Sequence, residues 1–141
     1  MEFFEKRKDY GAVFIRIIIG VFIIYGVQDN VFSREHMNEF AAFLSARSVP
    51  YPLAAAHLSA YAQMICGISI LLGAFVRWTA VPFIINFIAA IIIAHLGDTF
   101  RGMFPALAMI FIGFFFLFNG AGKLSVDDRL ERRRERAGQM N

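Results

Sequence analysis

The 141-residue chain is 58% hydrophobic, contains 17 phenylalanines and has a mean hydropathy of +0.58, which excludes an ordinary soluble domain of about 45–50% apolar composition. A single cysteine, Cys66, excludes an internal disulfide, a CxxC redox pair and a cysteine-rich metal site. The net charge of +3 does not indicate nucleic-acid binding, because the basic residues flank apolar segments as they do in membrane proteins.

Four apolar segments are each long enough to cross a bilayer, which takes roughly 20 residues of helix. They run from about 10 to 27, 52 to 76, 78 to 96 and 102 to 121. Backbone polar groups cannot stay unpaired in lipid, so the segments are expected to be helices. The sequence therefore predicts an all-α fold, an integral membrane four-helix bundle over residues 1–128, followed by a basic cytoplasmic tail over residues 129–141.

In the first segment, a basic start is followed by a long apolar run without a small-x-small cleavage site, so we interpret it as a retained span. Its polar positions are Arg16, on a stripe with Ala12, Gly20 and Ile23, and Tyr25 near its end. A cation at membrane depth calls for an explanation. Arg16 either binds an anionic or quinone-like ligand, or reaches the interface or helix carbonyls.

The first loop, residues 30–51, is the only long one. Met37, Ala41 and Leu44 recur at helical spacing after Ser33, a residue suited to capping a helix N-terminus. The pattern predicts a short interfacial helix in the first extracytoplasmic loop. This helix either covers the end of the bundle or acts as a lid over a site.

Polar residues also lie inside the second and third spans. Gln63 and Asn86 fall on faces of small and polar residues, as do interhelical contacts in membranes, so we expect them to join helices or to bind a ligand. The depth of Asn86 matches that of Arg16, so the two could touch. Further toward the outer end, His57, Tyr61 and His95 join Tyr25 in a layer that either binds a quinone head group and passes protons or forms an aromatic belt. Two histidines without a clear third ligand do not predict a metal site.

The segment after the fourth span contains Gly-x-Gly-Lys at Gly120 to Lys123 but lacks the spacing of a phosphate loop. We expect its glycines to end the helix and form a turn that lets Ser125 cap a tail helix. The N-terminus, the second-to-third loop and the tail hold ten Lys and Arg residues against three in the other two loops. The positive-inside rule then predicts a multi-pass protein of the cytoplasmic (inner) membrane with both termini cytoplasmic.

Three groups of residues in order resemble the DoxX family of small four-helix membrane proteins. They are Arg16-x-x-x-Gly20 with Gly26, then Gln63-x-x-Cys66-Gly67 through Gly73 and Arg77, then Gly120-Ala-Gly-Lys-Leu-Ser-Val-Asp127. The resemblance covers about residues 10 to 128. The family often has Glu where this chain has Gln63, so a proton-carrying role is not expected at that position.

The resemblance implies the four-helix fold and an association with quinone-linked oxidoreductases. Because the chain has no haem, flavin or iron–sulfur ligation signal, we expect a membrane subunit that binds quinone or another small ligand and takes electrons from a partner oxidoreductase subunit, leaving open whether it is itself an enzyme. The alternatives are a non-catalytic scaffold that anchors a soluble enzyme and a small carrier. Membrane lipid is an expected partner, and a homo-oligomer remains open.

Overall fold

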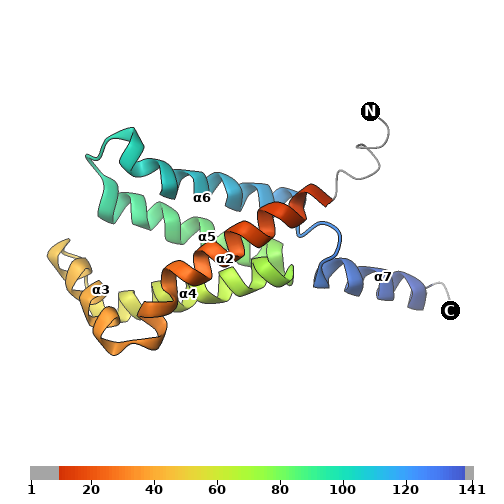
Figure 1. Cartoon of the computed structure of the whole chain (residues 1–141), viewed down its shortest axis with the longest axis horizontal. Helices are drawn as coiled ribbons and strands as arrows, with labels where there is room; N and C mark the ends of the chain where they lie inside the picture. The colour runs from red at the N-terminus through yellow and green to blue at the C-terminus, as the bar shows by residue number, and fades with distance from the viewer. Residues whose placement is uncertain (1–9, 139–141) are drawn as a thin grey trace.

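The computed structural model describes residues 10–138 (Figure 1). Its elements are α2 (Gly11–Phe32), α3 (Arg34–Ala46), α4 (Pro52–Leu72), α5 (Val76–Ala90), the π-helix η2 (Ile91–His95), α6 (Phe100–Asn119) and α7 (Val126–Gly138). Among the described residues, four helices are long and apolar enough to cross a membrane: α2, α4, α5 together with η2, and α6. The described part of the chain holds no strand, so the prediction of an all-α membrane bundle is confirmed.

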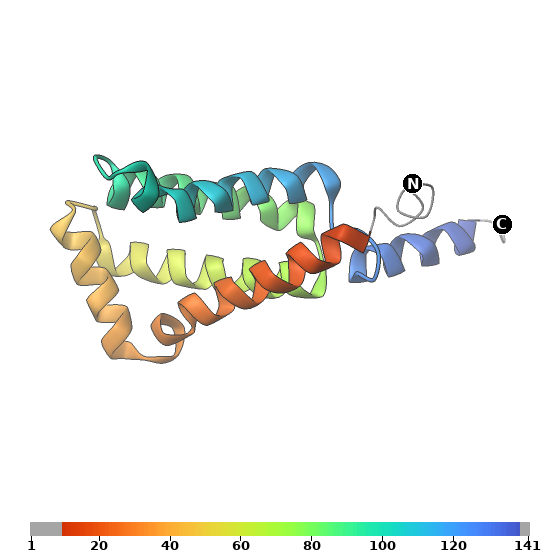
Figure 2. The same ribbon diagram turned by 45° about the horizontal axis from the view of Figure 1, so that its top comes forward.

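The spanning helices form two antiparallel pairs. α2 packs mainly on α4 and α5 packs mainly on α6, while contacts between α4 and α5 join the pairs (Figures 1 and 2). Glycines allow the close approach on which helix association in membranes depends. A Cβ on Gly20 would lie 2.9 Å from the Leu71 Cα, and one on Gly113 would lie 2.5 Å from Ile84 Cγ1. The core between the pairs is apolar, and large side chains such as Phe14 and Phe118 are exposed where lipid would cover them.

Several helix boundaries differ from the predicted ones. α4 ends at Leu72 rather than at residue 76, because Gly73 adopts a left-handed conformation with φ of 70°, the usual way for a helix to stop at glycine. α5 then begins at Val76, two residues before the predicted start, after Phe75 with φ of 54°. α2 also continues five residues beyond the predicted Val27, to Phe32. The third span changes to a π-helix over its last turn.

The two shorter helices lie at opposite ends of the bundle (Figures 1 and 2). α3 lies across one end, where Met37, Ala41 and Leu44 are buried in a cluster with residues of α2 and α4. Its N-terminus is capped by Ser33, whose side chain accepts from the His36 N–H. α7 projects away from the other end and buries no residue. We refer to these as the α3 end and the α7 end.

Candidate functional site

Arg16 is the buried cation of the bundle, with only 3% of its surface exposed. Its Nη1 donates to the Ala121 carbonyl at 2.8 Å and its Nη2 to the Leu124 carbonyl at 3.0 Å. Both acceptors belong to residues 120–128, the segment after α6 that we call the clasp. Hydrogen bonds from a charged donor are about twice as strong as neutral ones. Arg16 therefore holds the clasp against the bundle, which is the structural role that the sequence left open beside ligand binding.

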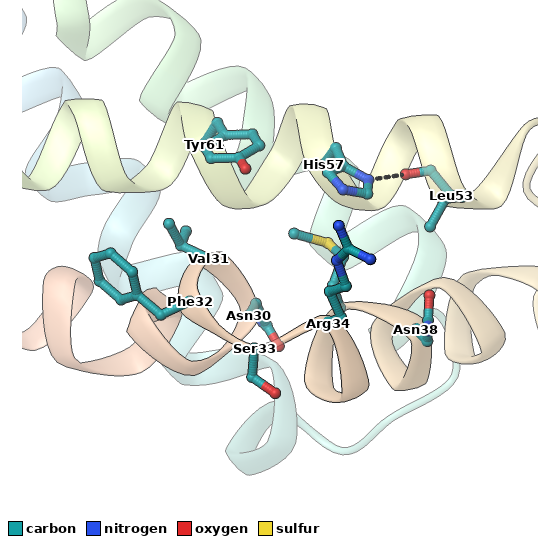
Figure 3. A pocket seen from close by; sticks show the side chains of 10 residues that line it. Asn30, Val31, Phe32, Ser33, Arg34, Asn38, Leu53, His57 and Tyr61 are labelled. Carbon is teal, nitrogen blue, oxygen red and sulfur yellow. Dashed lines mark hydrogen bonds between the residues drawn. The ribbon is translucent and has the colours of Figure 1, made fainter.

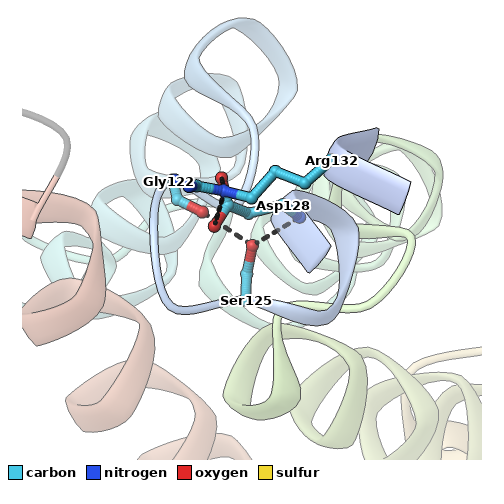
Figure 4. Close-up of polar contacts among 4 residues, drawn as sticks. All are labelled: Gly122, Ser125, Asp128 and Arg132. Atoms are coloured by element: carbon cyan, nitrogen blue, oxygen red, sulfur yellow. Dashed lines mark hydrogen bonds and ion pairs between the residues drawn. The ribbon is translucent and has the colours of Figure 1, made fainter. Parts of the chain in front are cut away.

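The absence of a side chain at Gly73 leaves the room that the Arg16 guanidinium occupies. A Cβ on Gly73 would lie 2.6 Å from Arg16 Nη1 and 2.5 Å from the Ser125 Cβ. Any larger residue would also have to adopt the positive φ that glycine accepts freely. Ser125, almost fully buried, donates to the Gly122 carbonyl at 2.6 Å and accepts from the Asp128 N–H at 3.1 Å (Figure 4). It thus caps α7 as predicted.

Asp127 completes the connection between the clasp and the spanning helices. Its carboxylate accepts from the N–H groups of Phe75 at 2.7 Å and Val76 at 3.1 Å, at the start of α5. Its own N–H donates to the Gly73 carbonyl at 3.0 Å. A carboxylate at a helix N-terminus satisfies unpaired donors and interacts favourably with the positive end of the helix dipole, and this one also attracts the Arg16 guanidinium. The clasp is thus a built structural unit that joins α2, α4, α5 and α7.

A second polar group joins α4 to α5 halfway along the bundle. Ser59 Oγ donates to Asn86 Oδ1 at 2.7 Å and accepts from Gln63 Nε2 at 3.2 Å. Asn86 therefore has the interhelical role that its sequence position indicated, whereas Gln63 bonds a residue of its own helix, α4. The contact between Asn86 and Arg16 that their similar depths allowed does not form, because Arg16 is turned toward the clasp. Ser59 is the residue that links the two amides.

A groove of about 680 Å³ opens at the α3 end, between the end of α2, the start of α3 and the start of α4 (Figure 3). Ligand pockets commonly measure about 300–1,000 Å³, so the space suits a small organic head group. We call it the α3-end groove. The residues that line it are Asn30, Val31, Phe32, Ser33, Arg34, Met37, Asn38, Leu53, His57 and Tyr61.

Three side chains give the α3-end groove its chemistry. His57 Nδ1 lies 2.8 Å from the Leu53 carbonyl, which can only accept, so Nδ1 carries a hydrogen and Nε2 of the neutral ring is an acceptor. Tyr61 lies one turn further along α4, with its ring centroid 6.0 Å from that of His57. Arg34 points from α3 toward His57 (Figure 3). The groove thus combines a permanent cation on Arg34, the hydroxyl of Tyr61 and a ring nitrogen of His57 that is able to take up a proton.

The structure separates the four residues of the predicted outer layer. His57 and Tyr61 line the α3-end groove, but Tyr25 and His95 do not. Tyr25 is 73% exposed on the outside of α2, the position expected of an aromatic-belt residue. His95, at the end of the π-helix, bonds Asp98 Oδ2 at 2.8 Å. The first and third spans therefore bring neither residue to the groove.

The sequence did not single out Arg34, Asn30 and Asn38 as binding residues, although they line the same groove. Ser33 was expected to cap α3, which placed Arg34 and Asn38 near the start of that helix. Their shared position in the groove depends on α3 lying across the end of the bundle beside α4, which the sequence does not show. Within residues 10–138, no group of three or more His, Cys, Asp or Glu side chains is placed to hold a metal ion.

Comparison with known proteins places this arrangement in context. The DoxX family profile matches residues 11–96, more than half of the chain. An uncharacterized membrane protein of Mycobacterium tuberculosis is 28% identical over 143 residues, which cover 90% of this chain and 85% of that protein. No solved structure matches the chain. The matched region runs from α2 to η2 and so contains Arg16, Gly73 and the whole α3-end groove.

Proposed function

Because this chain belongs to the DoxX family of membrane proteins, we propose that it is the membrane subunit of a quinone-linked oxidoreductase and binds the quinone head group in the α3-end groove. The observation that carries the proposal is the gathering of Arg34, His57 and Tyr61 around one cavity of suitable size. A quinone presents two carbonyl acceptors, and its reduced form presents two hydroxyl donors. A site for both forms needs donors as well as an acceptor.

The three side chains supply that combination. The Arg34 guanidinium donates to a carbonyl oxygen, and the Tyr61 hydroxyl can donate to an oxygen or accept from a hydroxyl. His57 Nε2 accepts a hydrogen bond from a quinol hydroxyl and is the ring nitrogen that can take up its proton. The Leu53 carbonyl holds the ring in the tautomer that leaves Nε2 available. Reduction of the quinone takes two electrons, which the partner oxidoreductase subunit supplies, and two protons.

Binding of a short-chain quinone tests the proposal. The full-length protein in lipid nanodiscs is titrated with decylubiquinone by calorimetry, alongside Arg34→Gln, His57→Phe and Tyr61→Phe. A lost hydrogen bond costs about 0.5–1.5 kcal/mol when neutral and about 1.5–3 kcal/mol when charged, so Kd should rise about 3- to 10-fold for the two α4 variants and about 10-fold or more for Arg34→Gln.

Tyr25→Phe is the matched control, since Tyr25 lies at the same end of the bundle but outside the groove. It should bind decylubiquinone as the unchanged protein does. A protein that binds no quinone would remove the proposal. Binding that all three groove variants leave intact would place the quinone elsewhere.

One observation favours the second candidate, a scaffold that anchors a soluble enzyme. α7 projects from the bundle rather than lying along it (Figure 1). Arg129, Arg133 and Arg136 share one exposed face at helical spacing. The side chains of these arginines form no hydrogen bond or ion pair with another described residue. Such a face suits an acidic protein surface. Isolation from native membranes should then recover a salt-sensitive protein partner that is lost when the three arginines are changed to Gln.

A further inference from the structure

A second groove, of about 750 Å³, lies at the α7 end between the start of α5, the clasp and α7. We call it the α7-end groove. Arg77 and Trp78 line it from α5, and Glu131, Arg134 and Glu135 line it from α7. It lies at the opposite end of the bundle from the α3-end groove and is therefore separate from the proposed quinone site. Three properties together indicate what it binds: its charges, its position along the membrane normal and its aromatic lining.

Several charged side chains that line this groove are already engaged, among them Lys123, whose ammonium lies over the Tyr10 ring at 5.8 Å from its centroid. The charges that are left balance. Asp127 is occupied by the first N–H groups of α5, and Asp128 pairs with Arg132 at 3.1 Å (Figure 4). Within residues 10–138, the side chains of Glu131, Arg134 and Glu135 form no hydrogen bond or ion pair. Arg77 makes one long hydrogen bond, from Nη2 to the Phe118 carbonyl at 3.5 Å, which leaves its other N–H groups available. The two arginines and the two glutamates suit a ligand that carries both charges.

These charges also follow an order along the membrane normal. Arg77 is the second residue of the spanning helix α5, so it lies at the boundary of the hydrocarbon. The Asp127 N–H bonds the Gly73 carbonyl, which places the start of α7 at that same level. Glu131 lies five residues after Val126, the first residue of α7. In a helix that runs along the membrane normal, this places Glu131 about 7.5 Å further from the bilayer centre. A headgroup layer is about 5–7 Å thick on each side of the bilayer, so the groove spans it.

Trp78 adds the third property. Its side chain is 80% exposed beside Arg77, in the position where tryptophan anchors a membrane protein at the lipid–water interface. An indole face also attracts an ammonium group. The α7-end groove thus offers a cation at the depth of a lipid phosphate, an indole beside it, and carboxylates further out.

We propose that the α7-end groove is a binding site for the headgroup of a zwitterionic phospholipid, with Arg77 on the phosphate and Glu131 and Trp78 on the ammonium. In such a lipid the phosphate lies nearer the acyl chains and the ammonium further out, which is the order of Arg77 and Glu131. A guanidinium matches phosphate oxygens with two parallel hydrogen bonds. The glutamates of the groove disfavour a headgroup that carries only negative charge, because they would repel it.

The tail arginines do not alter this balance. The residues of α7 that line the groove are Asp127, Asp128, Leu130, Glu131, Arg134 and Glu135. Arg129, Arg133 and Arg136 share the other side of the helix and are outside the lining. The groove-facing side of α7 is therefore the acidic one. Arg133→Gln offers a control that changes the charge of the same helix without touching the groove.

Native mass spectrometry of the full-length protein tests the proposal. The protein is delipidated in mild detergent and offered equal amounts of phosphatidylethanolamine and phosphatidylglycerol, and bound lipid is counted for the unchanged protein and for Arg77→Gln, Glu131→Gln and Arg133→Gln. We expect phosphatidylethanolamine to dominate. Arg77→Gln should lower its binding about 10-fold or more, the loss typical of a charge-assisted hydrogen bond. Glu131→Gln should shift the preference toward phosphatidylglycerol, and Arg133→Gln should change nothing.

Far-UV circular dichroism and the Tm verify that each variant stays folded, which is expected because Gln retains the helix propensity of Glu and Arg. Equal binding of the two lipids, or an Arg133→Gln effect as large as that of Arg77→Gln, would overturn the proposal. Soluble phosphoethanolamine is added as a separate arm. If it displaces the lipid at micromolar concentration, the groove serves a soluble zwitterion rather than a membrane lipid.

Discussion

Replacement of Arg16 by alanine should release the clasp. The substitution removes the hydrogen bonds to the Ala121 and Leu124 carbonyls, at 2.8 and 3.0 Å. Hydrogen bonds from a charged group contribute about 1.5–3 kcal/mol each, and a buried group left unpaired costs about 1–3 kcal/mol. Arg16 Nε is such a group in the unchanged protein, buried without a hydrogen-bond partner, so the net loss should be about 3 kcal/mol.

Two assays measure that loss. For a chain of this size 1 kcal/mol corresponds to about 4 °C, so the Tm in detergent should fall on the order of 10 °C. The effect should concentrate in the clasp, where a change of about 3 kcal/mol in local opening speeds cleavage on the order of 100-fold. Trypsin cuts after lysine and arginine, so cleavage after Lys123, followed by mass spectrometry, reports that opening directly.

Arg34→Ala is the control, because Arg34 is exposed and has no hydrogen-bond partner among the described residues. Surface substitutions of this kind usually change stability by less than about 0.5 kcal/mol, which is about 2 °C here. If Arg16→Ala leaves both the Tm and the cleavage rate after Lys123 within the range of this control, Arg16 does not hold the clasp. The structural role assigned to it would then be wrong.

Three further outcomes are expected. Gly73→Ala should lower the Tm as much as Arg16→Ala does, because its Cβ would lie 2.6 Å from Arg16 Nη1 at a φ of 70°; an unchanged Tm would contradict this packing. Ser59→Ala, measured by steric-trap unfolding in bicelles, should cost only about 0.6–2 kcal/mol, the range of interhelical hydrogen bonds in membranes, and a larger loss would mean that Asn86 depends on Ser59 for more than this bond. Green fluorescent protein fused after Asn141 should fluoresce and alkaline phosphatase there should be inactive, as the positive-inside rule requires; active phosphatase would reverse the predicted topology.

The hydrophobic segments predicted the fold well because the bilayer imposes helix and fixes its length. The boundary between α4 and α5 was missed for a reason that the sequence hides. Gly73 and Phe75 both take left-handed conformations, and the carboxylate that stabilises the start of α5 belongs to Asp127, more than fifty residues away. A local pattern cannot contain a cap that arrives from so far along the chain.

The candidate site was predicted in part. His57 and Tyr61 were identified because one turn of helix separates them, and that relation survives any arrangement of the helices. Whether Tyr25 and His95 face the same groove depends on how their helices are rotated, which hydropathy does not determine. Both lie outside the α3-end groove. Arg16 was recognised as a residue that needed a partner. Its partners are backbone carbonyls of the clasp, which no side-chain pattern could reveal.

Photolabelling with an azidoquinone tests the location of the quinone most directly. The full-length protein in nanodiscs is irradiated with the analogue, digested and mapped by mass spectrometry, with and without excess decylubiquinone. The proposed function predicts that displaceable label falls on residues 30–38 and 53–61, the segments that form the α3-end groove. Displaceable label confined to the segments around Gln63 and Asn86, or absent from the whole chain, would contradict it.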